Sequence, residues 1–235
     1  MLFSGFIWTF LFATSLYYIK WGFCADLTTG EVNNELYGIF SLGASMLMFI
    51  PLILGTVIAS PLMKAFKSII RFHRFLIALE FIPCLILFLL QVVGILHSVP
   101  MLFFACMIVV SMAIGMDFIP GETINIECMD YEIYVNGKDR SALCNACNKF
   151  LNKAQSALSS GLVGVILVAI GYNVDSTTGA FLGELSAIPS MLTWFIVVMG
   201  LIPGVMGLIS WLVLKQYPVT DEVRTQMRAA LEQNE

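Results

Sequence analysis

Six long stretches of this chain carry almost no charged residues, and this pattern limits the folds that are open to it. Each stretch is long enough for the roughly 20 residues of helix that cross a bilayer. Because 59% of the residues are hydrophobic and only 12% are charged, the composition lies outside the soluble range. The sequence therefore predicts an all-α membrane protein with six transmembrane helices. These cover about residues 1–22, 36–63, 75–96, 99–126, 141–172 and 189–217.

Several other classes of protein are disfavoured by the same residues. Membrane β-strands would be about 10 residues of alternating polarity, whereas residues 185–214 contain neither a charge nor an alternation. Residues 1–22 lack the basic start and the cleavage site of a signal peptide, so we expect a retained helix. No basic patch suggests nucleic acid. No catalytic triad or phosphate-binding loop is visible, and His73 and His97 are expected in interfacial loops. We predict no enzyme.

The distribution of basic residues predicts the orientation of the bundle. If the first helix starts in the cytosol, the cytosolic segments hold nine of the twelve Lys and Arg residues, and the opposite side holds only Lys20. The other two lie inside the fifth stretch. Because cytosolic loops are enriched in Lys and Arg, we expect a protein of the plasma membrane with both termini in the cytosol. Taken alone, Lys20 favours the opposite orientation.

The six cysteines lie mostly in or near apolar stretches, so they predict no disulfide framework. Cys144 and Cys147 have the C-x-x-C spacing of redox and zinc sites. They have no second pair and no histidine nearby, so we interpret them as part of a helix wall and expect neither a metal nor a cofactor.

The fifth stretch carries an unusual polar face. At 100° per residue its polar side chains fall within an arc of about 140°. These are Ser141, Asn145, Asn148, Lys149, Asn152, Lys153, Ser156, Ser159 and Ser160. In lipid such a face should meet neighbouring helices or a water-filled pathway. Hydrogen bonding between helices is the structural alternative. The two lysines favour a pathway, because each charge costs roughly 2.5–3.5 kcal/mol at the centre of a span.

Depth along this helix adds to the argument. Thirteen residues at about 1.5 Å each place Lys153 roughly 20 Å beyond Arg140, near the middle of a hydrocarbon core about 30 Å thick. Transporters hold their substrates at this depth. We therefore predict that one wall of a substrate or ion pathway is formed by Lys153 together with Asn145, Asn148, Lys149, Asn152 and Ser156.

Three carboxylates also lie in or beside the apolar stretches, namely Glu80, Asp117 and Glu122. Pro120 and Gly121 stand between the last two and are expected to interrupt the helix. Such a break beside two carboxylates is typical of transporter sites, so we add Asp117 and Glu122 to the predicted pathway. The alternative is a kinked helix whose carboxylates reach the headgroups or Lys149.

The segment before the fifth stretch resembles a known signature. Asp130-Tyr131-Glu132, then Gly137-Lys138, Arg140 and Lys153, is similar to the pattern of the glycoside-pentoside-hexuronide:cation symporters. These are the melibiose permease relatives within the major facilitator superfamily. The spacing also matches, with Glu127 three places before the Asp-Tyr pair and Lys153 thirteen after the arginine. The flanking sequences that agree are Gly171-Tyr172 and Tyr217-Pro218-Val219-Thr220.

The resemblance covers the C-terminal six of that family's twelve helices. It implies that residues 1–217 form one half of a facilitator fold, built as two inverted three-helix repeats, with residues 218–235 as a cytosolic tail. Met1 opens directly into an apolar helix, which suits a chain cut or split at the middle. The resemblance also implies that Lys153 faces carboxylates of the N-terminal half. The cytosolic gate that it implies consists of Glu127, Asp130, Tyr131 and Arg140.

The resemblance implies that the chain is part of a secondary active transporter. Together with an N-terminal six-helix half, it would carry out cation-coupled symport of a sugar or glycoside by alternating access. The coupling cation would be Na⁺ or H⁺. The family's usual Glu-Gly after the arginine is Ser141-Ala142 here, which leaves the substrate open. The alternative is a truncated or homo-oligomeric scaffold protein without transport of its own. In that case the partners of the chain would be the lipid bilayer and a second copy of the same chain.

The tail is expected to begin with a short surface helix. Thr220 is its predicted cap, Asp221 and Glu222 stand in its first turn, and Val223, Met227 and Leu231 share one face.

Overall fold

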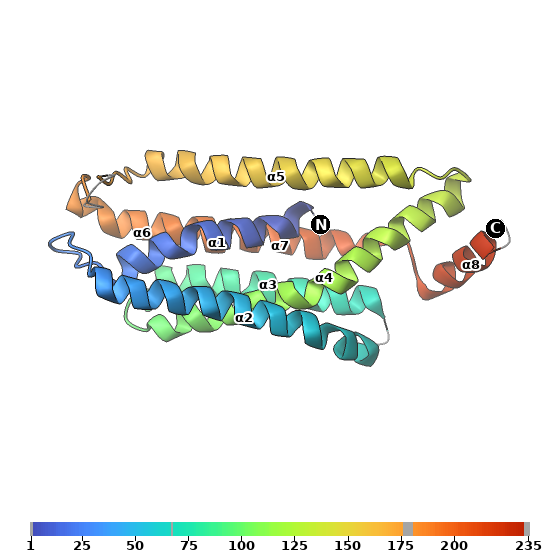
Figure 1. Ribbon diagram of the computed structural model, residues 1–235, viewed down its shortest axis with the longest axis horizontal. Coiled ribbons are helices and arrows are strands. Elements are labelled where there is room, and N and C mark those ends of the chain that lie inside the picture. Colours follow the sequence, from blue (N-terminus) through green and yellow to red (C-terminus); the bar gives the residue numbers. More distant parts are fainter. Residues whose placement is uncertain (1, 67, 176–180, 233–235) are drawn as a thin grey trace.

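The protein is a bundle of long helices that run roughly side by side along its longest axis (Figure 1). The computed structural model describes residues 2–66, 68–175 and 181–232. The long helices are α1 (Leu2–Phe23), α2 (Asn34–Phe66), α3 (Ile69–Val92), α4 (Pro100–Asn136) and α5 (Ser141–Ala169). The last part contains η1 (Leu185–Ala187), α6 (Ile188–Ile196), η2 (Val197–Leu201), α7 (Ile202–Val213), η3 (Leu214–Gln216) and α8 (Asp221–Glu232). The all-α prediction is confirmed.

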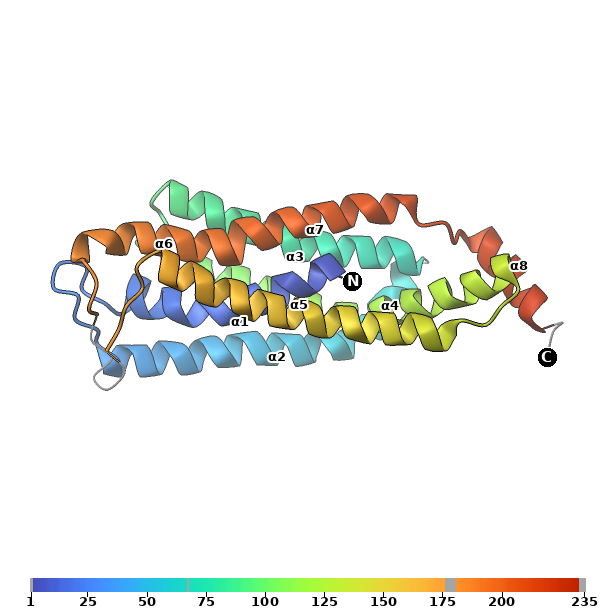
Figure 2. The ribbon, with the colours of Figure 1, turned by 90° about the horizontal axis from the view of Figure 1, so that it is seen from above.

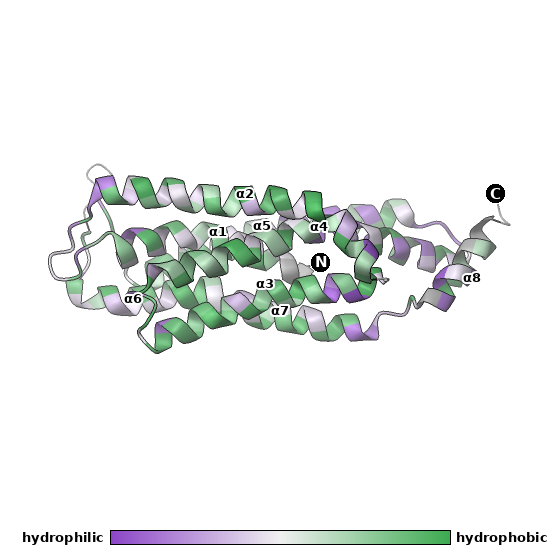
Figure 3. Ribbon diagram, turned by 90° about the horizontal axis from the view of Figure 1, so that it is seen from below, coloured by the Kyte–Doolittle hydropathy of each residue, from purple (hydrophilic) through white to green (hydrophobic). Residues whose placement is uncertain are grey.

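Five helical segments among the described residues are long and apolar enough to cross a membrane. They are α2, α3, α4, α5 and the continuous run Leu185–Gln216. The remaining long helix, α1, is not among the five, so the sixth span stays a prediction. Hydrophobic residues follow the lengths of the helices, and hydrophilic residues gather toward the two ends of the bundle (Figure 3).

The first helix, α1, forms the centre of the bundle. It packs against α2, α5, α6 and α7. Its largest side chains, including Phe10, Tyr18 and Trp21, are fully buried. A helix that is apolar around its whole circumference needs such cover on all sides, and α1 receives it from neighbours distant in the sequence.

The two helices at the edges, α2 and α5, are the most exposed of the five candidate spans. Figure 1 shows them on opposite sides of α1, and Figure 2 shows α3 and α7 together along another side of the bundle. The second helix packs chiefly on α4, whereas the fifth packs chiefly on α1. Much of the surface of α5 therefore has no protein cover.

The last span is not one uniform α-helix. A π-helical turn, η2, separates α6 from α7. Pro203 lies at the start of α7 and has no backbone N–H to continue the regular pattern, which accounts for the change of register. Gly200 lies in the same turn, where a Cβ would come within 2.8 Å of the carbonyl oxygen of Cys84 on α3. This turn thus allows close contact between the two helices.

Two predicted helix boundaries are wrong. The third helix starts at Ile69 rather than about residue 75, so His73 lies inside it and is buried, not in an interfacial loop. The fourth helix runs ten residues past the predicted end at about 126 and stops at Gly137, whose φ of 62° is left-handed. Asp130 is consequently helical. Hydropathy marks the apolar slab, whereas a helix can continue into water beyond it.

The predicted interruption at Pro120 is also wrong, because α4 is helical through this position. The hydroxyl of Thr123 donates a hydrogen bond to the carbonyl oxygen of Ile119 at 2.9 Å. Neighbouring helices and such side chains make proline tolerable within a membrane helix. The structure thus agrees with a helix that continues past Asp117 and Glu122.

The tail helix α8 begins as predicted. The backbone N–H of Val223 donates to the hydroxyl of Thr220 at 3.3 Å, which is an N-cap contact. Met227 is buried. The side chain of Leu231 and residues 233–235 lie outside the described residues.

Candidate functional site

A cavity of about 600 Å³ lies among α1, α3, α4 and α5. Its wall combines three carboxyl groups with amides, hydroxyls and one indole ring. The lining residues are Gly5, Trp8, Thr9, Glu80, Ile114, Asp117, Phe118, Gly121, Glu122, Asn152, Gln155 and Ser156. An apolar chamber with a few polar groups is the usual form of a small-molecule site.

The fifth helix meets the cavity along a narrow seam. Its buried residues, Gln155, Ser159 and Val163, follow one another at intervals of four and therefore share one face. A Cβ at Gly5 of α1 would lie 2.5 Å from the amide nitrogen of Gln155, so glycine leaves room for this side chain. The seam places Asn152 on the cavity wall.

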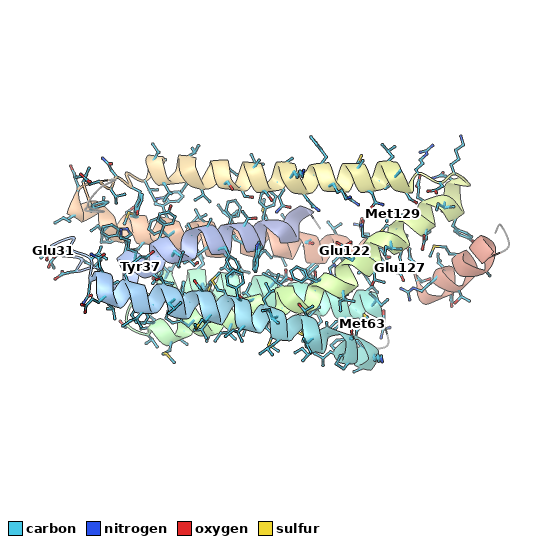
Figure 4. The ribbon with its side chains drawn as sticks, viewed as in Figure 1. Glu31, Tyr37, Met63, Glu122, Glu127 and Met129 are labelled. Atoms are coloured by element: carbon cyan, nitrogen blue, oxygen red, sulfur yellow. The ribbon has the colours of Figure 1, made fainter. Side chains whose placement is uncertain are left out.

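The carboxylates come from two helices that pack side by side. Glu80 belongs to α3 and is only 2% exposed. Asp117 and Glu122 belong to α4, and Figure 4 shows Glu122 where this helix rises toward α5. Charged side chains in a membrane segment normally face a polar cavity or a charged partner. Here the three carboxyl groups face the cavity.

His73 is the partner of Asp117. Its Nδ1 atom contacts Oδ1 of Asp117, and its side chain is 4% exposed. His73 and Glu80 stand seven residues apart on α3, which is about two helical turns, so they share a face of that helix. The sequence alone predicted a loop at His73 and did not indicate this pair, because a single histidine carries no signal of its distant partner.

Four of the predicted pathway residues line the cavity together. They are Asp117, Glu122, Asn152 and Ser156. Trp8, Thr9 and Gln155 complete the polar wall and were not predicted. Trp8 and Thr9 lie on the apolar helix α1, which offers no motif, and Gln155 lies outside the polar arc of α5.

The other predicted pathway residues lie elsewhere on α5. The amide of Asn148 donates a hydrogen bond to Oδ1 of Asn125 on α4 at 2.7 Å. Asn145, Lys149 and Lys153 are exposed and do not line this cavity. The polar arc is thus divided between a cavity wall, a contact between helices and an open surface.

The predicted gate residues form two separate networks. Glu127 is buried and accepts hydrogen bonds from Arg224 of α8, at 2.6 and 3.0 Å, and from the hydroxyl of Tyr217 at 3.1 Å. Burial raises the pKa of Tyr217. Arg140 instead lies 3.6 Å from Glu132 in an exposed pair. Among the described residues Glu127 and Arg140 thus have different partners, and the gate that they were expected to form stays a prediction.

The remaining gate residues, Asp130 and Tyr131, are partly exposed on the last turns of α4. Arg224 and Tyr217 were missed as partners of Glu127, since they follow it by 97 and 90 residues. The six cysteines are all free thiols.

Comparison with known families identifies the kind of protein. The family model of MFS/sugar transport proteins matches residues 32–221, which is more than half of the chain. The chain belongs to this family. Neither a curated protein nor a solved structure was found to match it.

Membership of the MFS/sugar transport family makes the chain a membrane transporter with several apolar helices. The matched residues include α3, α4 and α5, which supply most of the polar lining of the cavity. The cavity is therefore the candidate solute site of this MFS protein.

Proposed function

We propose that this chain is the C-terminal half of a sugar or glycoside symporter of the melibiose permease type. It would work by alternating access with an N-terminal six-helix partner. The observation that carries the proposal is the cavity, where carboxylates, amides and one indole converge within a bundle of the MFS/sugar transport family. Hydroxyl groups of a sugar can donate to carboxylates and bond with amides, and the apolar face of a pyranose can pack on an indole.

The residues divide into proposed roles. Asp117, Glu122 and Asn152 would hydrogen-bond the sugar, with Ser156 beside them, and Trp8 would pack against its ring. The exposed Lys153 would supply the counter-charge to carboxylates of the partner half, so that Na⁺ or H⁺ binding changes its pairing. Lysine on an uncovered face of α5 supports this role, since a charge at membrane depth calls for a partner.

The proposed architecture follows the same resemblance. Residues 1–217 would form two inverted three-helix repeats, with α1 as the sixth span and residues 218–235 as a cytosolic tail. The protein would lie in the plasma membrane, and the excess of Lys and Arg on one side supports termini in the cytosol.

A second candidate function rests on the exposure of α2 and α5. These two edges could instead meet a second copy of the chain in a homo-oligomeric scaffold. Such a scaffold would need no solute cavity, whereas the polar cavity of the bundle favours transport.

Purification of the tagged chain from its native membranes separates these two functions. We expect a six-helix protein to copurify, and the reconstituted complex to take up radiolabelled melibiose or methyl galactoside under an ion gradient. Homo-oligomers without uptake would support the scaffold. Because Asn152 lines the cavity, Asn152→Ala should reduce uptake at least tenfold, while Phe150→Ala, at an exposed position about 160° away around the same helix, should leave it within twofold.

Lys153→Ala tests the proposed counter-charge separately. The variant should keep exchange of labelled for unlabelled sugar but lose uptake against a gradient, because only coupling depends on this lysine. Accumulation of sugar at the wild-type level by Lys153→Ala would contradict the proposed role of this lysine as a counter-charge.

A further inference from the structure

The pair formed by His73 and Asp117 is unusual for its place in the molecule. It joins α3 to α4 beside the cavity, with side chains that are 4% and 15% exposed. Asp117 also lines the cavity, as does Glu80 from the same helix as His73. Asp117 therefore faces the chamber on one side and the buried imidazole on the other.

Charged side chains on the helices around this pair are few. No ionisable residue occurs in α6, η2 or α7. On α1 the ionisable side chains are Tyr17, Tyr18 and Lys20, close to its far end. On α2 the basic residue is Lys64, in the last turn.

The groups on α3 and α4 complete this environment. Arg74 follows His73, but its guanidinium lies 4.8 Å from the centre of the Trp211 ring, on the side of α7. Arg71 is exposed. Cys84 stands one turn beyond Glu80, with Cys106 of α4 near it. The Glu122 side chain is exposed and lines the cavity.

The charges of His73, Asp117 and Glu80 do not balance when all three groups are ionised. If His73 is protonated and both Asp117 and Glu80 are ionised, the three groups carry a net charge of −1 in a largely apolar bundle. Burial disfavours an uncompensated charge. One additional proton on a carboxyl group would make the set neutral.

We propose that His73, Asp117 and Glu80 form a proton-binding site that exchanges protons with the cavity. An imidazole beside carboxylates suits a proton, because histidine changes its charge near neutral pH, whereas hard cations prefer oxygen ligands. Within the described residues no group of three or more His, Cys, Asp or Glu side chains could hold a metal ion. The exchanged species is the proton itself, which moves between a carboxyl oxygen and water of the cavity.

This site would give the transporter its coupling ion, a step that rests on the proposed function. Asp117 is shared by the cavity and by His73, so a sugar hydroxyl bound to it would compete with the proton for the same oxygen atoms. Proton and solute binding would then influence each other through one side chain. The coupling ion would then be H⁺, and the proton held by this half would act together with the pairing of Lys153 to the partner half.

Carbodiimide labelling tests the site without a solute. Dicyclohexylcarbodiimide enters membranes and modifies carboxyl groups only while they are protonated, and mass spectrometry locates the adduct. We expect modification of Asp117 or Glu80 at several-fold higher yield at pH 6 than at pH 9, and no protection by 200 mM NaCl. Glu127 is an internal control, because both oxygen atoms of its buried carboxylate accept hydrogen bonds from Arg224, and it should stay unmodified.

Two variants sharpen the result. His73→Gln should change the pH at which labelling falls by at least one unit, while His97→Gln should not change it. Labelling no greater than that of Glu127, protection by NaCl, or an unchanged profile in His73→Gln would each overturn the inference. Failure of sugar uptake with pH-dependent labelling intact would reject the proposed function and leave the proton site standing.

Discussion

At the scale of single residues, the most defined interaction is the one between Glu127 and Arg224. Their side chains are 7% and 15% exposed, and two hydrogen bonds join them. Removing one partner of a buried ion pair leaves the other charge uncompensated, which costs about 3–5 kcal/mol. This pair therefore decides whether α8 stays docked on the end of α4.

We expect Glu127→Gln to release α8 from the bundle, because Arg224 then loses its charged partner. The free energy of opening of α8 should fall by about 3 kcal/mol. Hydrogen exchange of the α8 amides, measured by mass spectrometry, reports this change directly.

Glu132→Gln is the matched control. It removes the carboxylate of the exposed pair with Arg140, and surface pairs contribute only about 0–1 kcal/mol. Equal exchange in the two variants would show that the buried pair does not hold α8.

At the scale of elements, close packing between α2 and α4 depends on two glycines. A Cβ at Gly55 or at Gly115 would come within 3 Å of the backbone of the other helix. Small residues allow this approach in membrane bundles, where packing replaces the hydrophobic effect. The contact supports α4, which carries Asp117 and Glu122.

Gly115→Ala should push the two helices apart and destabilise the protein by about 1–3 kcal/mol, the usual effect of overpacking. The temperature of unfolding in detergent, followed by circular dichroism, should fall. Gly43→Ala is the control on α2, because a Cβ there meets nothing within 4 Å. This variant should unfold at the wild-type temperature or slightly above, since alanine favours helix. A Gly115→Ala protein as stable as wild type would show that the helices can separate without loss.

At the scale of the whole molecule, the open surface of α5 is the main feature. Lys153 and Leu158 are both exposed on this helix, yet they stand about 140° apart at 100° per residue. One side of α5 thus suits a polar setting and another suits lipid. In the proposed two-half transporter the first would face the central pathway.

Cysteine labelling checks this assignment. In the reconstituted complex, on a background without native cysteines, Lys153→Cys should react with a membrane-impermeant maleimide at least tenfold faster than Leu158→Cys. The reason is that thiols ionise and react in water but not in lipid. Equal and slow reaction of both would place Lys153 away from any aqueous pathway.

The fold and the site were predictable to different degrees. The apolar runs predicted the bounds of α2 and α5 to within a few residues, because the length of a span is a local property of the sequence. The polar arc likewise indicated Asn152 and Ser156 as cavity residues, since helical periodicity is also local. The arc placed Lys153 with them as well. This side chain does not line the cavity, and its place on a pathway between two halves stays a prediction.

The sequence by itself determined that this is a helical membrane protein of several spans, because hydrophobicity and helix length depend only on consecutive residues. Only the tertiary structure decided which charged groups meet. His73 pairs with Asp117, and Glu127 pairs with Arg224 rather than with Arg140. The physical reason is that the packing of whole helices sets such pairs, and it brings together residues that no local pattern connects.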